Sequence, residues 1–100
     1  MKKFKFYTIQ AWMLETLEFK TLIQVAVYAI IYGFKNHNYT GSRQYLASLC
    51  LCDVRTIDRA LDYLVKKEYL IKRIITKPYG SFRGYVAIDV FKNLNFVILL

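Results

Sequence analysis

The chain has 100 residues, the length of one domain, and 56% of them are hydrophobic, which is enough to bury a core and excludes a disordered chain. Only 4 Gly and 1 Pro are present, so low-complexity and collagen-like chains are excluded as well. Fifteen Lys and Arg against 7 Asp and Glu give a net charge of +8, which attracts nucleic acid or an anionic surface, although the same charge also serves simply to keep a basic domain soluble.

No segment has the pattern of a signal peptide or a membrane span. The basic residues Lys2 and Lys3 precede alternating Phe and Lys rather than a continuous apolar stretch. The longest apolar run, Leu22–Phe34, is interrupted by Gln24 and Gly33 and is shorter than the about 20 residues that cross a bilayer. We therefore expect a soluble, cytoplasmic domain without a membrane partner.

Two helices are predicted in the first third of the chain. Residues 9–17 carry apolar side chains at helical spacing, namely Ile9, Trp12, Met13 and Leu17. Residues 21–34 are apolar on nearly every side, and a helix without a polar face is covered on most sides. The second helix is therefore expected to be the core helix of the domain.

A helix-turn-helix unit is predicted in the middle of the chain. Gly41 and Ser42 resemble a turn that ends in an N-cap, followed by a helix over residues 43–50. Asp53 is the next N-cap candidate, at the start of a helix over residues 54–67. The buried stripe of that helix is expected at i, i+3, i+4 and i+7, namely Ile57, Ala60, Leu61 and Leu64. Two helices joined by so few residues form a helix-turn-helix.

After Glu68 the apolar period changes from that of a helix to that of a strand. Strands are expected over residues 69–76 and 85–90, separated by a turn region that is marked by Pro78, Gly80, Ser81 and Gly84. This hairpin, residues 69–90, is the expected wing. The fold class is therefore mainly α with a small β-hairpin (α+β), a winged helix-turn-helix over residues 1–90. The apolar tail 91–100 is compatible with packing over the core, against a second copy or against a further domain.

Three segments around the predicted turn resemble the core of winged-helix DNA-binding proteins: Leu46–Leu49, Arg55–Leu61 and Leu64–Ile71. Three more segments are similar to a narrower family, the N-terminal winged-helix domain of phage-type replication initiators, or replisome organisers, of low-GC Gram-positive bacteria and their mobile elements: Tyr7–Leu14, Val27–Phe34 and Thr40–Leu46. The resemblance covers about residues 6 to 76. It departs at two places where such domains usually carry Gly: the turn, here Cys50–Leu51, and the position after the recognition helix, here Glu68.

The resemblance implies that the helix opened by Asp53 is the recognition helix, which enters the major groove. Its candidate DNA-binding residues are Arg55, Thr56 and Arg59, with Arg55, Asp58, Arg59 and Asp62 expected opposite the buried stripe. Residues 53–65 hold two Arg and three Asp, a net charge of −1. The alternative is a solvated face with Arg–Asp pairs, which makes little contact with DNA.

Most of the positive charge lies further along the chain. Residues 66–83 carry a net charge of +5, with Tyr79 and Phe82 interleaved near the hairpin tip. The candidate phosphate-binding residues are Lys66, Lys72, Arg73, Lys77 and Arg83. The alternative is an edge hairpin kept soluble by its charges. A further phosphate site is expected at the start of the helix over residues 43–50, formed by Ser42, Arg43 and Gln44, although Ser42 is also compatible with a capping role alone.

The residue inventory argues against an enzyme. Cys50 and Cys52 are too close for a structural disulfide and lack the ligands of a zinc site, so we expect reduced thiols, at least one of them in the core. His37 stands alone in a polar loop, and no Gly-rich phosphate loop or catalytic constellation is present. We expect no metal, no cofactor and no small-molecule substrate.

The function expected from these features is DNA binding by a winged helix, with double-stranded DNA as the partner. The narrower resemblance implies replication initiation of a phage or mobile element. Two alternatives are a transcriptional regulator and a winged-helix protein–protein interaction module with little DNA contact. A homodimer or a complex with a replication protein is also compatible with the sequence.

Overall fold

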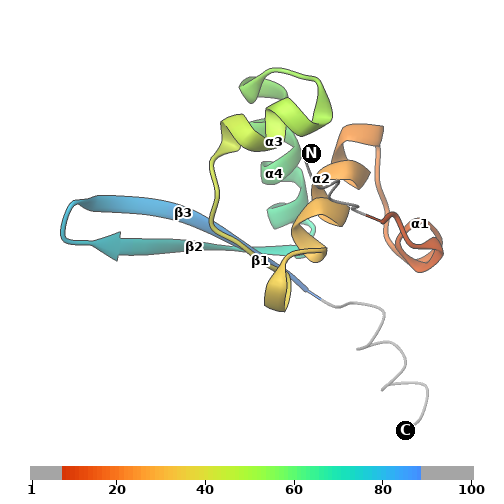
Figure 1. Ribbon diagram of the computed structural model, residues 1–100. Helices are drawn as coiled ribbons and strands as arrows, with labels where there is room; N and C mark the ends of the chain where they lie inside the picture. The colour runs from red at the N-terminus through yellow and green to blue at the C-terminus, as the bar shows by residue number, and fades with distance from the viewer. Residues whose placement is uncertain (1–7, 89–100) are drawn as a thin grey trace, which may run out of the picture.

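The computed structural model describes residues 8–88, and its four helices and three strands follow one another in the order of a winged helix-turn-helix (Figure 1). The elements are α1 (Ala11–Thr16), α2 (Leu22–Tyr32), the short 3-10 turn η1 (Lys35–His37), β1 (Asn38–Tyr39), α3 (Arg43–Cys50), α4 (Val54–Lys66), β2 (Leu70–Lys77) and β3 (Gly80–Ala87). The expected α+β fold class is confirmed.

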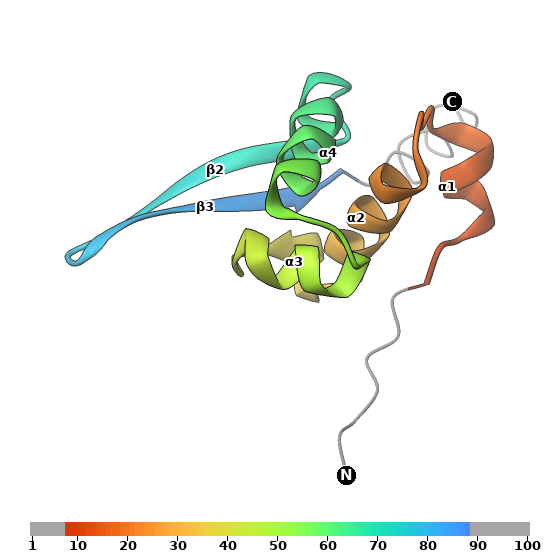
Figure 2. The same ribbon diagram turned by 90° about the horizontal axis from the view of Figure 1, so that it is seen from above.

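The three strands form one antiparallel sheet in the order β1-β3-β2. Asn38 of β1 pairs with Val86, and the hairpin β2–β3 is paired from Leu70 and Ala87 at its base to Lys77 and Gly80 at its tip. The helices cover only the base of this sheet, and the rest of the hairpin projects beyond them (Figures 1 and 2). We refer to β2–β3 with its turn as the wing.

The core is built around α2, as its apolar sequence predicted. This helix packs against α3, α4 and the base of the sheet, and most of its side chains are buried. The buried stripe expected on α4 is confirmed. The largest fully buried side chains are Tyr28, Tyr39, Met13, Ile31, Leu46, Ile57, Leu61, Leu64, Leu70 and Val27.

The two predicted N-caps are confirmed, and they set where α3 and α4 begin. Ser42 Oγ accepts a hydrogen bond from the Tyr45 backbone N–H at 3.0 Å, and Asp53 Oδ1 accepts one from the Thr56 N–H at 2.8 Å. Each cap satisfies a donor that the first turn of a helix leaves without a partner. The cap at Asp53 therefore sets where the turn between the two helices ends.

The two positions that depart from the usual glycines both adopt left-handed backbone. Leu51, at the C-terminus of α3, has φ 54°, and Glu68, just after α4, has φ 64°. Each turn is closed by a backbone hydrogen bond across it, from Cys52 N to Ala47 O at 3.1 Å and from Tyr69 N to Leu64 O at 2.9 Å. The chain thus keeps the usual turn geometry and tolerates a non-glycine residue at each strained position.

Several sequence expectations for the wing and its neighbours are wrong in detail. Gly80, Ser81 and Gly84 belong to strand β3 rather than to the turn, which is only Pro78–Tyr79, so β3 begins five residues before the predicted position 85. Strand β1 was not expected, because two residues in a polar segment show no alternation. The N-terminal helix is shorter than the predicted 9–17.

Residues 1–7, the end of the predicted second strand (89–90) and the apolar tail 91–100 lie outside the described residues. Within the described range, no helix has the length and apolar character that crossing a bilayer requires.

The base of the wing is held by the core through backbone groups of Ile88. The Tyr28 hydroxyl donates a hydrogen bond to the Ile88 carbonyl at 2.6 Å, and the Ile88 N–H donates to the Tyr69 carbonyl at 2.9 Å. Since the Tyr28 side chain is fully buried in the core, the direction in which the wing leaves the domain depends on the packing of α2.

Candidate nucleic-acid interface

The N-terminus of α3 holds the three polar residues that were expected to meet a phosphate. The Ser42 hydroxyl accepts the capping hydrogen bond described above, so at least one of its lone pairs is used within the helix. Gln44 is exposed, whereas Arg43 is half-buried and extends toward α4. The structure therefore gives these neighbours different surroundings.

Arg43 forms an ion pair with Asp58 of α4. Its Nη1 lies 2.7 Å from both carboxylate oxygens. The hydrogen bond that Arg43 donates to Asp58 and the negative charge of that carboxylate raise the pKa of Arg43, so the guanidinium remains charged at any physiological pH. The pair joins the two helices of the helix-turn-helix and neutralises one of the carboxylates of α4.

Asp58 was expected opposite the buried stripe, and the structure shows it instead at the side of α4 that faces α3. Its partner Arg43 lies fifteen positions earlier in the chain, outside the i+3 and i+4 range in which pairs within one helix form. The outermost stripe of α4 consists of the exposed residues Arg55, Arg59, Asp62 and Lys66. This stripe carries three cations and one carboxylate.

The net charge of −1 counted for residues 53–65 is therefore a poor description of the exposed face. Of the three Asp residues, Asp53 caps the helix and Asp58 is paired with Arg43. Thr56 is half-buried, and the hydrogen bond from its side chain is the largest cause that lowers the pKa of Asp53. Arg55 and Arg59 remain as the exposed residues one turn apart that have suitable side chains for base edges.

The wing is cationic on both of its faces. In an antiparallel pair, residues directly opposite each other point to the same side, so Lys72, Tyr85, Ile74 and Arg83 share the side that faces the helices. Arg73, Gly84, Lys77 and Gly80 share the other side. All four basic residues are exposed, and no Asp or Glu occurs between residues 69 and 88.

Of the two lysines at the end of α4, only Lys66 is directed outward. Lys67 Nζ lies 3.7 Å from Glu18 Oε2, two residues after the end of α1. Lys66 is exposed and extends the stripe of Arg55 and Arg59.

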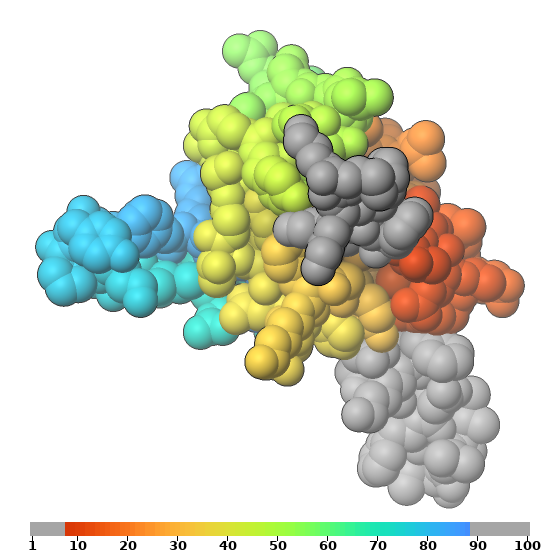
Figure 3. All heavy atoms as spheres, viewed as in Figure 1, coloured from red at the N-terminus to blue at the C-terminus, as the bar shows by residue number. Residues whose placement is uncertain are grey.

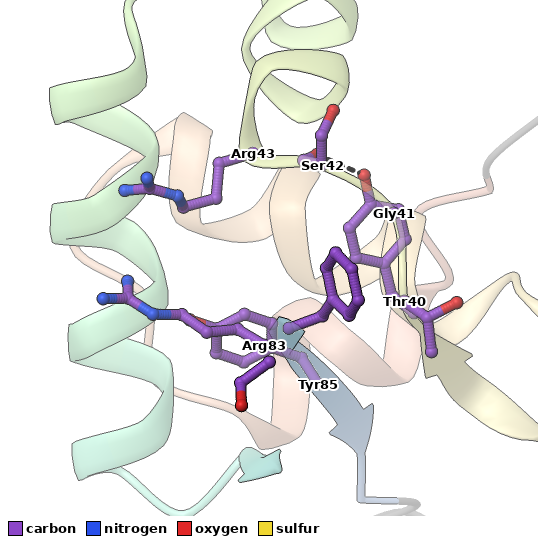
Figure 4. A pocket seen from close by; sticks show the side chains of 9 residues that line it. Thr40, Gly41, Ser42, Arg43, Arg83 and Tyr85 are labelled. Atoms are coloured by element: carbon purple, nitrogen blue, oxygen red, sulfur yellow. Dashed lines mark hydrogen bonds between the residues drawn. The ribbon is translucent and has the colours of Figure 1, made fainter. Parts of the chain in front are cut away.

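A pocket of about 490 Å³ connects the α3 N-terminus to the wing. Ser42 and Arg43 line one side of it, and Ser81 and Arg83 of β3 line the other. Figure 4 shows that Arg43 and Arg83 both extend toward α4. These two guanidinium groups, on elements forty residues apart in the chain, therefore both lie on the side of the pocket that faces α4.

Tyr85 and Gly41 complete this pocket, and neither was expected from the sequence. Burial raises the pKa of the Tyr85 hydroxyl, and the nearby charge of Arg83 opposes the shift. Gly41 packs against the Tyr39 ring, where a Cβ atom would lie 2.6 Å from the Tyr39 hydroxyl oxygen. That hydroxyl donates a hydrogen bond to the Ser42 carbonyl and so anchors the start of α3. Only the three-dimensional pairing of β1 with β3 brings these residues together.

The remaining candidate residues are not assembled into a reactive site. Cys50 and Cys52 are free and half-buried, so the expectation that at least one lies within the core is wrong; they pack against its edge. Burial raises the pKa of both thiols, which disfavours the reactive thiolate.

His37 stacks on the Tyr32 ring with the ring centroids 3.9 Å apart, and its Nδ1 lies 2.6 Å from the Tyr32 carbonyl oxygen. Among residues 8–88 no group of three potential metal ligands occurs.

A comparison with protein families finds one match that covers more than half of the chain. The family model described as "Helix-turn-helix domain" matches residues 18–70, the segment that holds α2, β1, α3 and α4 and ends at the first residue of the wing. No curated protein and no solved structure matches the chain.

Proposed function

This chain belongs to the helix-turn-helix domain family, and on that premise we propose that it binds double-stranded DNA with α4 in the major groove and the wing on the backbone. The family membership supports DNA binding in general. The assignment of the two elements rests on the chemistry of their exposed side chains.

Helix α4 is the element suited to base contacts. Arg55 and Arg59 lie one turn apart on its exposed stripe, and an Arg side chain can donate two parallel hydrogen bonds to guanine O6 and N7. Asp62 on the same stripe repels phosphates, which favours a helix that lies against base edges rather than along one strand of the backbone.

The wing is the element suited to phosphate contacts. Lys72, Arg73, Lys77 and Arg83 are exposed on a hairpin without acidic residues. Cations on both faces of a hairpin neutralise phosphates on both sides of a groove, and such contacts carry no sequence information. Figure 3 shows the wing standing clear of the rest of the domain, so it reaches a different part of the duplex from α4.

The observation that carries this proposal is the ion pair between Arg43 and Asp58. The pair neutralises Asp58, one of the carboxylates that argued against DNA contact by α4, and the exposed stripe of that helix then carries more positive than negative charge. A protein–protein module with little DNA contact remains the alternative of another class, and a titration with DNA separates the two.

The titration uses the full chain and a labelled duplex of mixed sequence over a series of salt concentrations. If the four wing cations each neutralise one phosphate, log K falls against log salt with a slope of about −3 to −4. Binding that is absent at low salt contradicts the proposal and favours the protein–protein module.

Within this function we propose a role in replication initiation of a phage or mobile element, in the cytoplasm and without enzymatic activity. The support is the similarity of residues 6–76 to the N-terminal domain of replication initiators. Such a role requires a further partner, either a second copy of the chain or a replication protein.

The replication role and the transcriptional alternative are separated by the DNA region that the protein occupies. Footprinting identifies that region, and the region is then cloned into a plasmid that lacks an origin. Replication of this plasmid only when the protein is supplied supports an initiator. A plasmid that never replicates, together with a changed reporter level from an adjacent promoter, supports a regulator.

A further inference from the structure

The tip of the wing carries two exposed aromatic rings, which phosphate binding does not require. The Tyr79 side chain is 78% exposed and Phe82 is 45% exposed. Their ring centroids are 5.8 Å apart with an interplanar angle of 61°, an edge-to-face pair. Large apolar side chains that gather on an exposed projection usually mark a binding surface.

The turn holds Tyr79 outward in a defined conformation. Lys77 pairs with Gly80, so the hairpin closes through Pro78 and Tyr79 alone, and the Pro78 ring restricts the backbone of the turn. Gly80 has a φ of 151°, a backbone angle that residues other than glycine rarely adopt. No atom lies within 4 Å of the position that its Cβ would occupy, so space is not what requires glycine there. The glycine is therefore required by the backbone geometry of the turn. A rigid turn lowers the entropy lost when the ring binds.

The charges around the rings indicate what the tip binds. Lys77 and Arg83 flank the aromatic pair, and the hairpin has no acidic residue. A ligand that satisfies both features combines negative charge with flat apolar surfaces, and nucleic-acid bases on their phosphate backbone have both. In an intact duplex the base faces are stacked on one another, so a ring gains access to them only where the strands have opened.

We propose that the wing tip stacks Tyr79 on an unpaired base where duplex DNA is open, with Phe82 supporting the ring from the side. The proposal rests on the proposed DNA-binding function and extends it to a particular DNA structure. The cations of the wing hold the backbone beside the opening, and the ring covers a base face that is otherwise exposed to water.

The test compares two DNA probes with the full chain: a duplex, and the same duplex with a central unpaired bubble that contains 2-aminopurine. The chain should bind the bubble about tenfold more tightly than the duplex, which corresponds to about 1.4 kcal/mol and lies within the range for one stacked base. Stacking on Tyr79 should also quench the 2-aminopurine fluorescence.

Three variants identify the source of the preference. Tyr79→Ala should remove the tenfold preference and the quenching, whereas Tyr79→Phe should keep both because the ring is retained. Ile74→Ala is the matched control, since Ile74 is an exposed apolar residue of the same hairpin, 63% exposed, but is not aromatic and lies away from the tip.

The outcomes separate this inference from the function on which it rests. If the chain binds the duplex with the expected salt dependence but Tyr79→Ala leaves the preference for the bubble unchanged, the stacking inference is wrong and the DNA-binding proposal stands. If the chain prefers neither probe, or Ile74→Ala acts as strongly as Tyr79→Ala, the inference is also overturned. Absence of binding to both probes overturns both proposals.

Discussion

Arg43 Nη1 lies 2.7 Å from both carboxylate oxygens of Asp58, so the first residue of α3 is tied to the middle of α4. The contact gives Arg43 two possible partners during DNA binding, the carboxylate in the free protein and a phosphate in the complex. If Arg43 contacts a phosphate in the complex, Asp58 competes with that phosphate for the guanidinium group.

We therefore expect Asp58→Ala to increase duplex affinity on all sequences. The change removes a negative charge and releases Arg43, so the salt dependence should steepen by about 0.9 in the log–log slope. Asp62→Ala is the matched control, because it removes the same charge from the same helix without releasing an arginine. Equal salt slopes for the two variants, measured by fluorescence anisotropy, would show that Arg43 contributes no phosphate contact.

The wing and α4 should respond differently to the removal of charge. Replacing Lys72, Lys77 and Arg83 by neutral residues should weaken binding to every sequence and reduce the salt slope by up to about three units. Arg59→Ala should instead cost about 1–3 kcal/mol on a preferred site and little on random DNA. If the Arg59 change abolishes binding on every sequence and the wing changes have no effect, the two roles are assigned the wrong way round.

Gly41→Ala should destabilise the domain by about 1–3 kcal/mol, because the new methyl group would lie 2.6 Å from the hydroxyl oxygen of the buried Tyr39 side chain. Gly84→Ala is the control, since its Cβ meets the flexible end of the Ile75 side chain at 3.0 Å and lies at ordinary contact distance, 3.6 Å, from the Tyr39 carbonyl oxygen. Urea unfolding measures both. A loss for Gly84→Ala that equals the loss for Gly41→Ala contradicts this explanation.

Leu51→Gly should stabilise the domain by about 0.5–1 kcal/mol. Left-handed backbone costs a residue with a side chain about 1–2 kcal/mol, and glycine avoids this cost but loses about 0.5–1 kcal/mol of entropy on folding. The Leu51 side chain is 93% exposed, so its removal loses little packing. Ser48→Gly is the control, at an exposed position within α3. It has the same loss of conformational entropy on folding but relieves no left-handed backbone, so it should lower the free energy of unfolding.

The N-cap of α4 should make stability depend on pH in the acid range. The hydrogen bond from Thr56 lowers the pKa of Asp53 below its unfolded value of about 3.9, so the ionised carboxylate is favoured in the folded state. Its contribution is fully present above that unfolded value and is lost as the pH falls through the lower folded pKa. The difference in Tm between the wild type and Asp53→Asn should therefore shrink below about pH 4. A constant difference from neutral to acid pH would contradict this role.

Local patterns in the sequence predicted the helices and the fold class because their signals lie within a few residues. The caps Ser42 and Asp53 and the stripe of Ile57 and Leu64 each depend on neighbours one or two turns away.

The position of Asp58 was not predictable in this way. Its pairing with Arg43 depends on how α3 crosses α4, and the count of charges along α4 therefore suggested a less favourable DNA surface than the structure presents. Gly84 was similarly misleading, since glycine usually marks a turn. Here it lies within β3, where the missing Cβ leaves space for Ile75.

The hydrogen bonds that Tyr28 and Tyr69 make with Ile88 attach the base of the wing to the rest of the domain. This attachment is the pivot about which the whole hairpin tilts, and a small rotation there moves the tip by a larger distance. Strands of eight residues extend about 26 Å, so a tilt of about 10° at the pivot displaces the tip by about 4–5 Å. That displacement is comparable to the spacing between successive phosphates. If the wing contacts phosphates, a small repacking of α2 at its base therefore changes which of them its cations reach.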